Sequence, residues 1–248
     1  MTLEVQGLRF KRGKLEIGPV EISLDPGEII SICGKNGSGK TSSLYAMAGL
    51  DRIDSGKVII DGANMEYMNP REISRKIAIV KQEIPTPMSF TVNDIMEISA
   101  FTRGNDRDAI NQSLDLCGIS HLINREFSTL SGGEKRMVMI AAGIYQDSSY
   151  IFLDEPSSFL DIDKISTLSS ILVKLKKMGR GIIVVNHDIN YARKISDKIM
   201  LMKNGKVIAY GNTDETITVE NLERTYDAYF DKYDSPEGLR FYASSSHF

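Results

Sequence analysis

The chain has 248 residues, which suits one large domain or two closely packed lobes. Hydrophobic residues make up 42% and charged residues 25%, so the composition is that of an ordinary globular protein with a sizeable core, and a disordered chain is excluded. The net charge of −3 gives no support to non-specific binding of nucleic acid, so no nucleic-acid partner is expected. No apolar run reaches the ~18 residues that a membrane-spanning helix needs.

The first ten residues alternate in polarity and include an acid, so they do not resemble a secretory signal. The two cysteines, Cys33 and Cys117, lack the spacing of metal ligands. A small reduced side chain at Cys33 suits a buried strand in a reducing cytoplasm. We therefore expect a cytoplasmic protein.

The first part of the chain predicts strands followed by a helix. Residues 3–10 and 21–24 alternate like antiparallel strands, and the apolar run 29–33 is typical of a buried strand. A helix is expected over residues 40–50 and a short strand over 58–61. From about residue 83 to 129 the pattern changes to helices, with candidates at 92–100 and 107–117, which predicts an inserted helical lobe.

From residue 130 the pattern returns to alternating helices and strands. Helices are expected over 134–145, 164–178 and 191–195, and strands over 150–154, 182–186, 199–202 and 207–210. Asn204-Gly205 is typical of a hairpin turn between the last two strands. We predict a single α/β domain over residues 1–248. Its parts are a core lobe (1–82 and 130–220) that begins with an antiparallel β subdomain, a helical subdomain (83–129) and a C-terminal extension (221–248).

A glycine-rich segment follows the strand at 29–33 and fits the pattern G-x-x-x-x-G-K-[ST]. In such a loop, glycines allow successive backbone N–H groups to point at an anion, and the helix that follows adds its own unpaired N–H groups. Lys40 is expected to reach the β- and γ-phosphates of a nucleotide, and the Thr41 hydroxyl to bind Mg²⁺. The alternative, an ordinary turn with a surface lysine, does not account for the strand and helix on either side. The predicted phosphate loop comprises Gly34, Lys35, Asn36, Gly37, Ser38, Gly39, Lys40, Thr41 and Ser42.

Two acidic residues end the apolar run 150–153. Open α/β sheets place ligand sites at the carboxyl ends of their strands. Asp154 is therefore expected to hold Mg²⁺, and Glu155 to act as the general base on the attacking water. Two solvated acids before a turn at Pro156 would be the alternative if the strand stood alone.

A second glycine-rich segment, Ser131-Gly132-Gly133-Glu134, precedes the helix expected from residue 134. Together with the phosphate loop and the acidic strand end, it makes the chain resemble the ATP-binding-cassette (ABC) ATPases, the nucleotide-binding subunits of ABC transporters. The resemblance extends from about residue 3 to residue 211. It implies the P-loop fold of these ATPases, a glutamine loop at Gln82, a signature segment at residues 130–134, a loop at 158–161 that includes Asp161, and a switch histidine at His187.

In that family two subunits pack head-to-tail and trap two ATP molecules, so the resemblance implies a nucleotide-bridged homodimer. Ser131, Gly132, Gly133 and Glu134 would then meet the γ-phosphate that the partner holds. A helix N-terminus is a suitable anion site, and one subunit does not need two phosphate cradles. Considered alone, the segment is also typical of a flexible turn.

The resemblance gives Gln82 and His187 roles that the residues alone do not. His187 would contact the γ-phosphate and orient the water, and Gln82 would contact Mg²⁺ or the water. Either residue, taken alone, is an ordinary polar side chain after a strand. The family usually places an aromatic residue near position 12 to stack on adenine. Here Arg12 occupies that position, and a guanidinium plane can also stack on a base.

Segments at 71–78, 82–85 and 160–162 and the tail after residue 212 are similar to the ATPases of iron–siderophore, haem and vitamin B12 importers. That similarity implies a separate membrane permease contacted through about residues 83–96, an extracytoplasmic substrate-binding protein, and a position on the cytoplasmic face of the membrane. The alternative is the ATPase of iron–sulfur-cluster assembly, which has soluble partners and also favours a Gly-Gly-Glu-Lys run such as the one at Glu134. Residues 83–103 resemble the importers instead.

Overall fold

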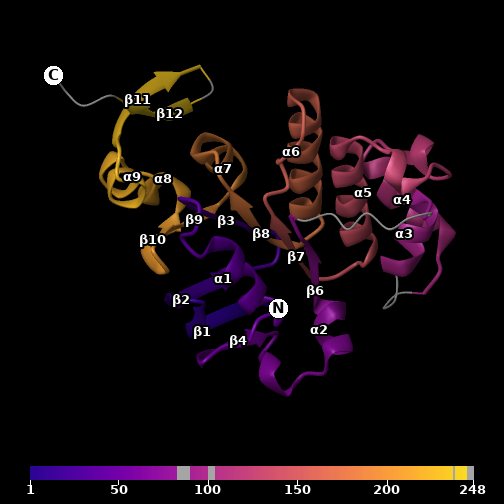
Figure 1. Cartoon of the computed structure of the whole chain (residues 1–248), viewed down its shortest axis with the longest axis horizontal. Coiled ribbons are helices and arrows are strands. Elements are labelled where there is room, and N and C mark those ends of the chain that lie inside the picture. The colour runs from indigo at the N-terminus through magenta and orange to yellow at the C-terminus, as the bar shows by residue number, and fades with distance from the viewer. Residues whose placement is uncertain (83–89, 100–103, 237, 245–248) are drawn as a thin grey trace.

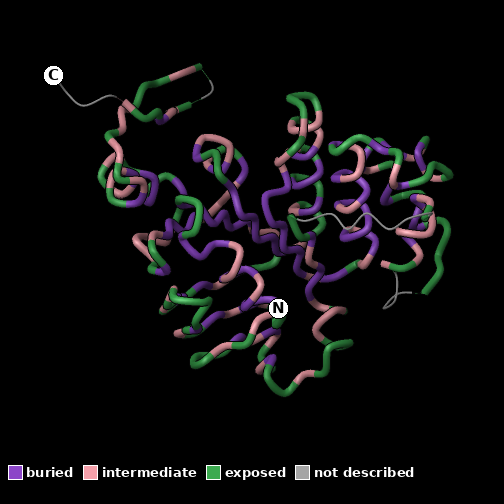
Figure 2. Tube along the Cα trace, in the orientation of Figure 1, coloured by how far each residue is buried: buried purple, intermediate pink, exposed green. Residues whose placement is uncertain are grey.

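The structure is a computed structural model that describes residues 1–82, 90–99, 104–236 and 238–244 (Figure 1). Its framework consists of a four-stranded antiparallel sheet, a six-stranded sheet and a separate two-stranded hairpin. The buried part of the trace runs through the middle of the molecule along the central strands (Figure 2). Among the residues that the structure describes, no helix combines the length and apolar character that crossing a membrane requires.

The antiparallel sheet has the strand order β2-β1-β4-β5. Its strands are β1 (Leu3–Arg12), β2 (Leu15–Leu24), β4 (Ser55–Ile60) and β5 (Ala63–Asn64). The alternation expected over residues 3–10 is present, because the apolar residues of β1 are buried against the core. The expected start of the second strand at residue 21 is wrong, because β2 pairs with β1 from Leu15 onward. Gly18 and Pro19 interrupt the pattern in the sequence but not the strand.

The six-stranded sheet has the order β10-β9-β3-β8-β7-β6, and all its neighbouring strands are parallel except β9 and β10. Its strands are β3 (Ile29–Gly34), β6 (Ile77–Val80), β7 (Tyr150–Asp154), β8 (Gly181–Asn186), β9 (Lys198–Lys203) and β10 (Lys206–Asn212). Strands β3, β7 and β8 are buried along their whole length, as expected for strands covered on both faces. Because β3, β8 and β7 are parallel neighbours, their carboxyl ends meet at one edge. The phosphate loop follows β3, Glu155 follows β7 and His187 follows β8, so all three lie at that edge.

Each of the six predicted helices is present with similar bounds, whereas the helices at Pro70–Lys76, Thr213–Thr216 and Val219–Tyr226 were not predicted. The helices are α1 (Lys40–Met47), α2 (Pro70–Lys76), α3 (Val92–Ser99), α4 (Arg107–Leu116), α5 (Gly132–Tyr145), α6 (Ile162–Lys177), α7 (Ile189–Ile195), α8 (Thr213–Thr216) and α9 (Val219–Tyr226), with 3₁₀ turns at Met65–Tyr67, Ser120–Leu122 and Phe127–Thr129. Helix α1 ends before the expected residue 50, because Gly49 adopts φ 73° and turns the chain. Helix α7 begins two residues earlier than expected, since the Asp188 side chain caps it.

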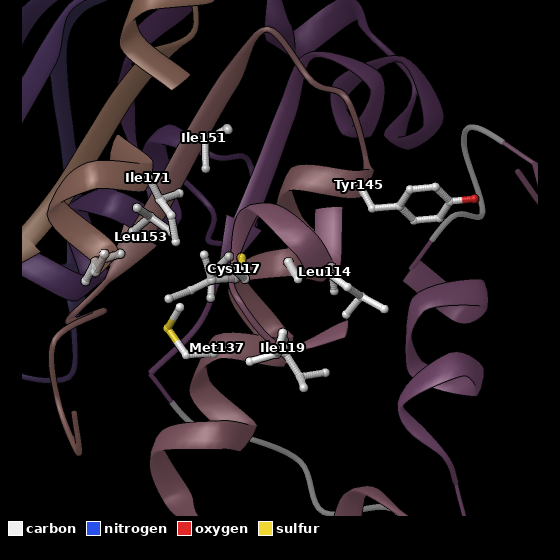
Figure 3. Packing of buried hydrophobic residues seen from close by; sticks show 14 of the residues in the cluster. Leu114, Cys117, Ile119, Met137, Tyr145, Ile151, Leu153 and Ile171 are labelled. Atoms are coloured by element: carbon white, nitrogen blue, oxygen red, sulfur yellow. The ribbon is translucent and has the colours of Figure 1, made fainter. Parts of the chain in front are cut away.

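Two hydrophobic clusters lie on opposite faces of the six-stranded sheet. Side chains alternate along a strand, so β7 directs Ile151 and Leu153 to one cluster and Tyr150 and Phe152 to the other. The first cluster also contains α3, α4, α5 and α6 (Figure 3), which places the helical lobe against this face. The second is closed by α1 and the antiparallel sheet.

The C-terminal extension packs on the far edge of the six-stranded sheet. Helix α9 and the hairpin formed by β11 (Tyr229–Ser235) and β12 (Gly238–Ser244) share a third cluster with α7 and β9. The expected pair of short strands around residues 235–238 is present, although Glu237 itself lies outside the described residues. The Asn204-Gly205 turn between β9 and β10 is also confirmed, with positive φ at both positions.

Candidate active site

The phosphate loop connects β3 to α1, and its glycines adopt backbone conformations that other residues rarely reach. Gly37 has φ 75° and Gly39 has φ 102°. At Gly34 a Cβ atom would lie 2.1 Å from the carbonyl oxygen of Met202, so a side chain does not fit there. The Lys40 side chain folds back over the loop, where its Nζ donates to the carbonyl oxygens of Gly34 at 2.9 Å and Lys35 at 3.0 Å.

Lys40 is the buried cation of this loop, with a side chain largely shielded from water. Burial lowers the pKa of Lys40, and the negative charges of Glu155 and Asp154 oppose that shift. A buried ammonium whose acceptors among the described residues are two carbonyl oxygens gains from an anionic ligand. The Ser38 hydroxyl is also buried in the loop and has no hydrogen-bond partner among the residues that the structure describes. Both features fit a nucleotide phosphate.

Thr41 and Asp154 lie in direct contact although 113 positions separate them. The Thr41 Oγ1 donates to Asp154 Oδ1 at 2.9 Å, and the Tyr45 hydroxyl donates to Asp154 Oδ2 at 3.0 Å. Burial raises the pKa of Asp154. A buried carboxylate beside a hydroxyl fits Mg²⁺, which prefers oxygen ligands. Sequence reasoning missed Tyr45, although it lies one helical turn after Thr41, a spacing that places both on one face.

Glu155 is held by three side chains at the start of the loop that follows β7. Gln82 Nε2 donates to Glu155 Oε2 at 2.7 Å, His187 Nε2 contacts Glu155 Oε1, and the Ser158 hydroxyl lies 3.4 Å from Oε2. The backbone of Glu155 adopts φ 47°, which is uncommon outside glycine and is often found at functional sites. The structure thus brings together the three residues expected to act on the attacking water.

A cavity of about 570 Å³ lies over the phosphate loop and opens to solvent. It is lined by Arg12, Leu15, Asn36, Gly37, Gly39, Lys40, Thr41, Ser42, Gln82, Glu155 and His187. Arg12 reaches the rim, where its Nη1 lies 3.3 Å from Asp51 Oδ1. Leu15 is the lining residue that the sequence did not indicate. Leu15 is the first residue of β2 and pairs with Arg12 of β1, so the pairing of these strands places both residues at the cavity.

The signature segment lies outside this cavity's lining among the described residues. Ser131 caps α5, because its hydroxyl accepts from the backbone N–H of Glu134 while the Glu134 carboxylate accepts from that of Ser131. Hydrogen bonds from Ser131 hold the pKa of Glu134 below its usual range. Glutamate and glutamine complete this capping box equally well, so Glu134 is compatible with the signature. Asp161 precedes α6 and also lies apart from the cavity.

Known proteins are similar to this chain over most of its length. Residues 17–158 match the family described as ABC transporter. The petrobactin import ATP-binding protein YclP of Bacillus subtilis is 33% identical over 87% of this chain and 88% of its own length. The ferric enterobactin transport ATP-binding protein FepC of Escherichia coli is 29% identical over 91% of this chain and 89% of its own length.

Solved structures of two proteins also resemble this chain. A transporter described as metal-chelate type, in an inward-facing conformation, superposes with a TM-score of 0.83 at 25% identity and covers 98% of both chains. The ATP-binding cassette MJ0796, solved as a dimer bound to ADP and Pi, superposes with a TM-score of 0.76 at 26% identity over 85% of this chain and 98% of its own.

The fold and these comparisons define an ATP hydrolase of the P-loop class. The chain belongs to the ABC transporter family, in which it is an ATP-binding cassette. YclP and FepC are named for import and transport, and neither gives support to the cluster-assembly alternative.

Proposed function

We propose that this protein is the ATP-hydrolysing subunit of an importer for a metal chelate such as an iron–siderophore, haem or cobalamin complex. The observation that carries the proposal is the contact of Gln82, Glu155 and His187 beside a phosphate loop. The import direction and the cargo class rest on the relatives, which are named for petrobactin, haemin and enterobactin import or transport.

In the proposed reaction each residue of the site has its own role. Lys40 and the loop amides hold the β- and γ-phosphates of ATP, and Thr41 and Asp154 hold Mg²⁺, which neutralises phosphate charge when bound. Glu155 accepts a proton from the attacking water. Gln82 and His187 orient that carboxylate through the contacts they already make with it. Arg12 offers its guanidinium plane to the adenine.

The proposed active form is a homodimer with two shared sites. Ser131 and the first backbone N–H groups of α5 form a helix N-terminus that does not line the chain's own cavity. Such an N-terminus suits the γ-phosphate that a partner holds. The cassette MJ0796, which superposes on 85% of this chain, was solved as a dimer, and this supports the homodimer.

The permease contact is proposed for about residues 83–96, at the start of the helical lobe. Residues 83–89 of this stretch lie outside the described residues. In the remainder, the Phe90 side chain is 40% exposed, whereas Val92 and Met96 are buried. An extracytoplasmic substrate-binding protein completes the proposed system, and the chain would lie on the cytoplasmic face of the membrane.

Phe90→Asp tests this docking surface. The variant should retain basal ATP hydrolysis, because the hydrogen bond from Phe127 N to the Phe90 carbonyl oxygen does not depend on the side chain. A mild-detergent pull-down from native cells, analysed by mass spectrometry, measures the amount of polytopic membrane protein that binds to the tagged chain. With Phe90→Asp this amount should fall on the order of tenfold, because charged groups are costly at the core of an interface.

Val173→Asp is the matched control, because Val173 is a similarly exposed apolar residue, at 42%, and belongs to α6 rather than to residues 83–96. It should leave both readouts unchanged. Loss of basal hydrolysis in Phe90→Asp would show that Phe90 is a core residue. Recovery of soluble cluster-assembly scaffolds and no membrane protein by the unmodified chain would overturn the importer role.

A further inference from the structure

Arg136 is a buried cation in the second turn of α5, the helix that begins at the signature segment. Its residue is only 1% exposed, which is rare for arginine. None of the roles proposed for the site uses Arg136 or its neighbours Lys135 and Met137.

The guanidinium of Arg136 donates to three backbone carbonyls on two segments of the site, the one before Gln82 and the one around Glu155. Nη1 donates to the carbonyl oxygen of Lys81, Nη2 to that of Asp154, and Nε to that of Pro156 at 3.3 Å. Lys81 directly precedes Gln82, and Asp154 and Pro156 flank Glu155. The planar side chain of Arg136 therefore fixes the backbone next to Gln82 and next to Glu155.

The position of Glu155 needs such support. Its φ of 47° lies in a sparsely populated region, and such conformations persist where surrounding contacts determine them. Its backbone N–H donates to the carbonyl oxygen of Val185 at 3.2 Å, which fixes it to β8. The hydrogen bonds from Arg136 fix the carbonyl groups on either side of Glu155. The bond to the Lys81 carbonyl fixes the backbone next to Gln82 in the same way.

The charge of Arg136 also matters at this site. Burial lowers the pKa of Arg136 to about 10, and the negative charges of Asp154 and Glu155 oppose the shift. The guanidinium therefore stays charged at neutral pH and offsets part of the negative potential where the two carboxylates gather.

We propose that Arg136 is a positioning residue for ATP hydrolysis, which holds Glu155 and Gln82 in their mutual contact and links the signature helix to the general base of the same chain. This inference rests on the proposed roles of Glu155 and Gln82. It does not depend on the permease or the cargo.

Arg136→Lys keeps the positive charge, but a single ammonium cannot replace a planar fork that reaches three carbonyls. We expect kcat for MgATP hydrolysis to fall at least about tenfold, because small misplacements of reacting groups are costly. The Kd for a fluorescent ATP analogue should change less than about twofold, since Arg136 is not among the described residues that line the cavity. Arg136→Gln, which leaves no buried unpaired charge, should show the same separation of kcat from Kd.

Tyr145→Phe is the matched control at the other end of α5 (Figure 3). Tyr145 is fully buried, and its hydroxyl donates to the carbonyl oxygen of Gly104 at 2.9 Å. Its loss should lower Tm and leave kcat at the wild-type value when measured below Tm.

Several outcomes would overturn the proposal. These are an unchanged kcat in the folded Arg136 variants, a parallel loss of kcat and nucleotide affinity, or an equal loss of kcat in Tyr145→Phe. Failure of both Arg136 variants to fold while Tyr145→Phe folds would assign the residue to folding instead. A wild-type chain without turnover would refute the proposed function itself, which distinguishes the two failures.

Discussion

Glu155→Gln should lower MgATP hydrolysis by about 10³-fold, the range that a general base contributes, while ATP binding persists. In the unmodified chain, Gln82 Nε2 donates to Glu155 Oε2 at 2.7 Å. The amide of Glu155→Gln keeps the size of the side chain and an oxygen that can accept this bond, but it cannot take a proton from water. Lys40, Thr41 and Asp154 are unchanged, so nucleotide affinity should stay within a few-fold. Phosphate release measures turnover, and gel filtration with light scattering should show an ATP-dependent dimer.

Glu215→Gln serves as the control for Glu155→Gln, because Glu215 is an exposed acid on α8. It makes the same chemical change away from the cavity and should hydrolyse ATP at the wild-type rate. If Glu155→Gln turned over ATP at a rate close to that of Glu215→Gln, Glu155 would not be the base.

Lys40→Ala should weaken ATP binding on the order of 100-fold, because charge-assisted hydrogen bonds to phosphate are each worth about 1.5–3 kcal/mol. The ammonium already lies over the loop, within 3.0 Å of the Lys35 carbonyl oxygen, so little rearrangement is needed to reach a phosphate. Titration calorimetry with ATP measures the change, with Tm recorded for the same samples.

Lys206→Ala is the corresponding control, because Lys206 is an exposed lysine at the start of β10. Its removal alters net charge equally and should leave ATP affinity unchanged. An affinity of Lys40→Ala within about threefold of this control would contradict the role of Lys40 in phosphate binding.

Local patterns in the sequence predicted the parts of this fold that depend on local chemistry. The buried strand before the phosphate loop, the helix from Lys40 and the acidic end of β7 follow from apolar runs and turn residues, and all are present. Where an expected boundary was wrong, a tertiary contact or a cap decided it. Pairing with β1 extends β2 across Gly18 and Pro19, and Asp188 starts α7 early.

The contacts inside the site were harder to predict. Gln82, Glu155 and His187 lie on three loops, and only the order of the parallel strands brings them together. The roles of Gln82 and His187 came from the family resemblance, whereas the role of Glu155 followed from its place at the acidic end of a buried strand. The role of Arg136 could not be predicted from the sequence, because the three backbone carbonyls that accept from it belong to other parts of the chain. A buried arginine can be explained only when its acceptors are known.

In the proposed homodimer, each active site combines the phosphate loop of one chain with the signature segment of another. The most direct measurement mixes two inactive variants, Lys40→Ala and Ser131→Arg, and follows phosphate release with MgATP. The first variant keeps an intact signature, and the second keeps an intact phosphate loop. In a mixed dimer one site then has both intact parts, so we predict activity well above the sum of the separate variants. If the mixture stays as inactive as its components, or if Ser131→Arg alone hydrolyses ATP at the wild-type rate, the shared-site account is wrong.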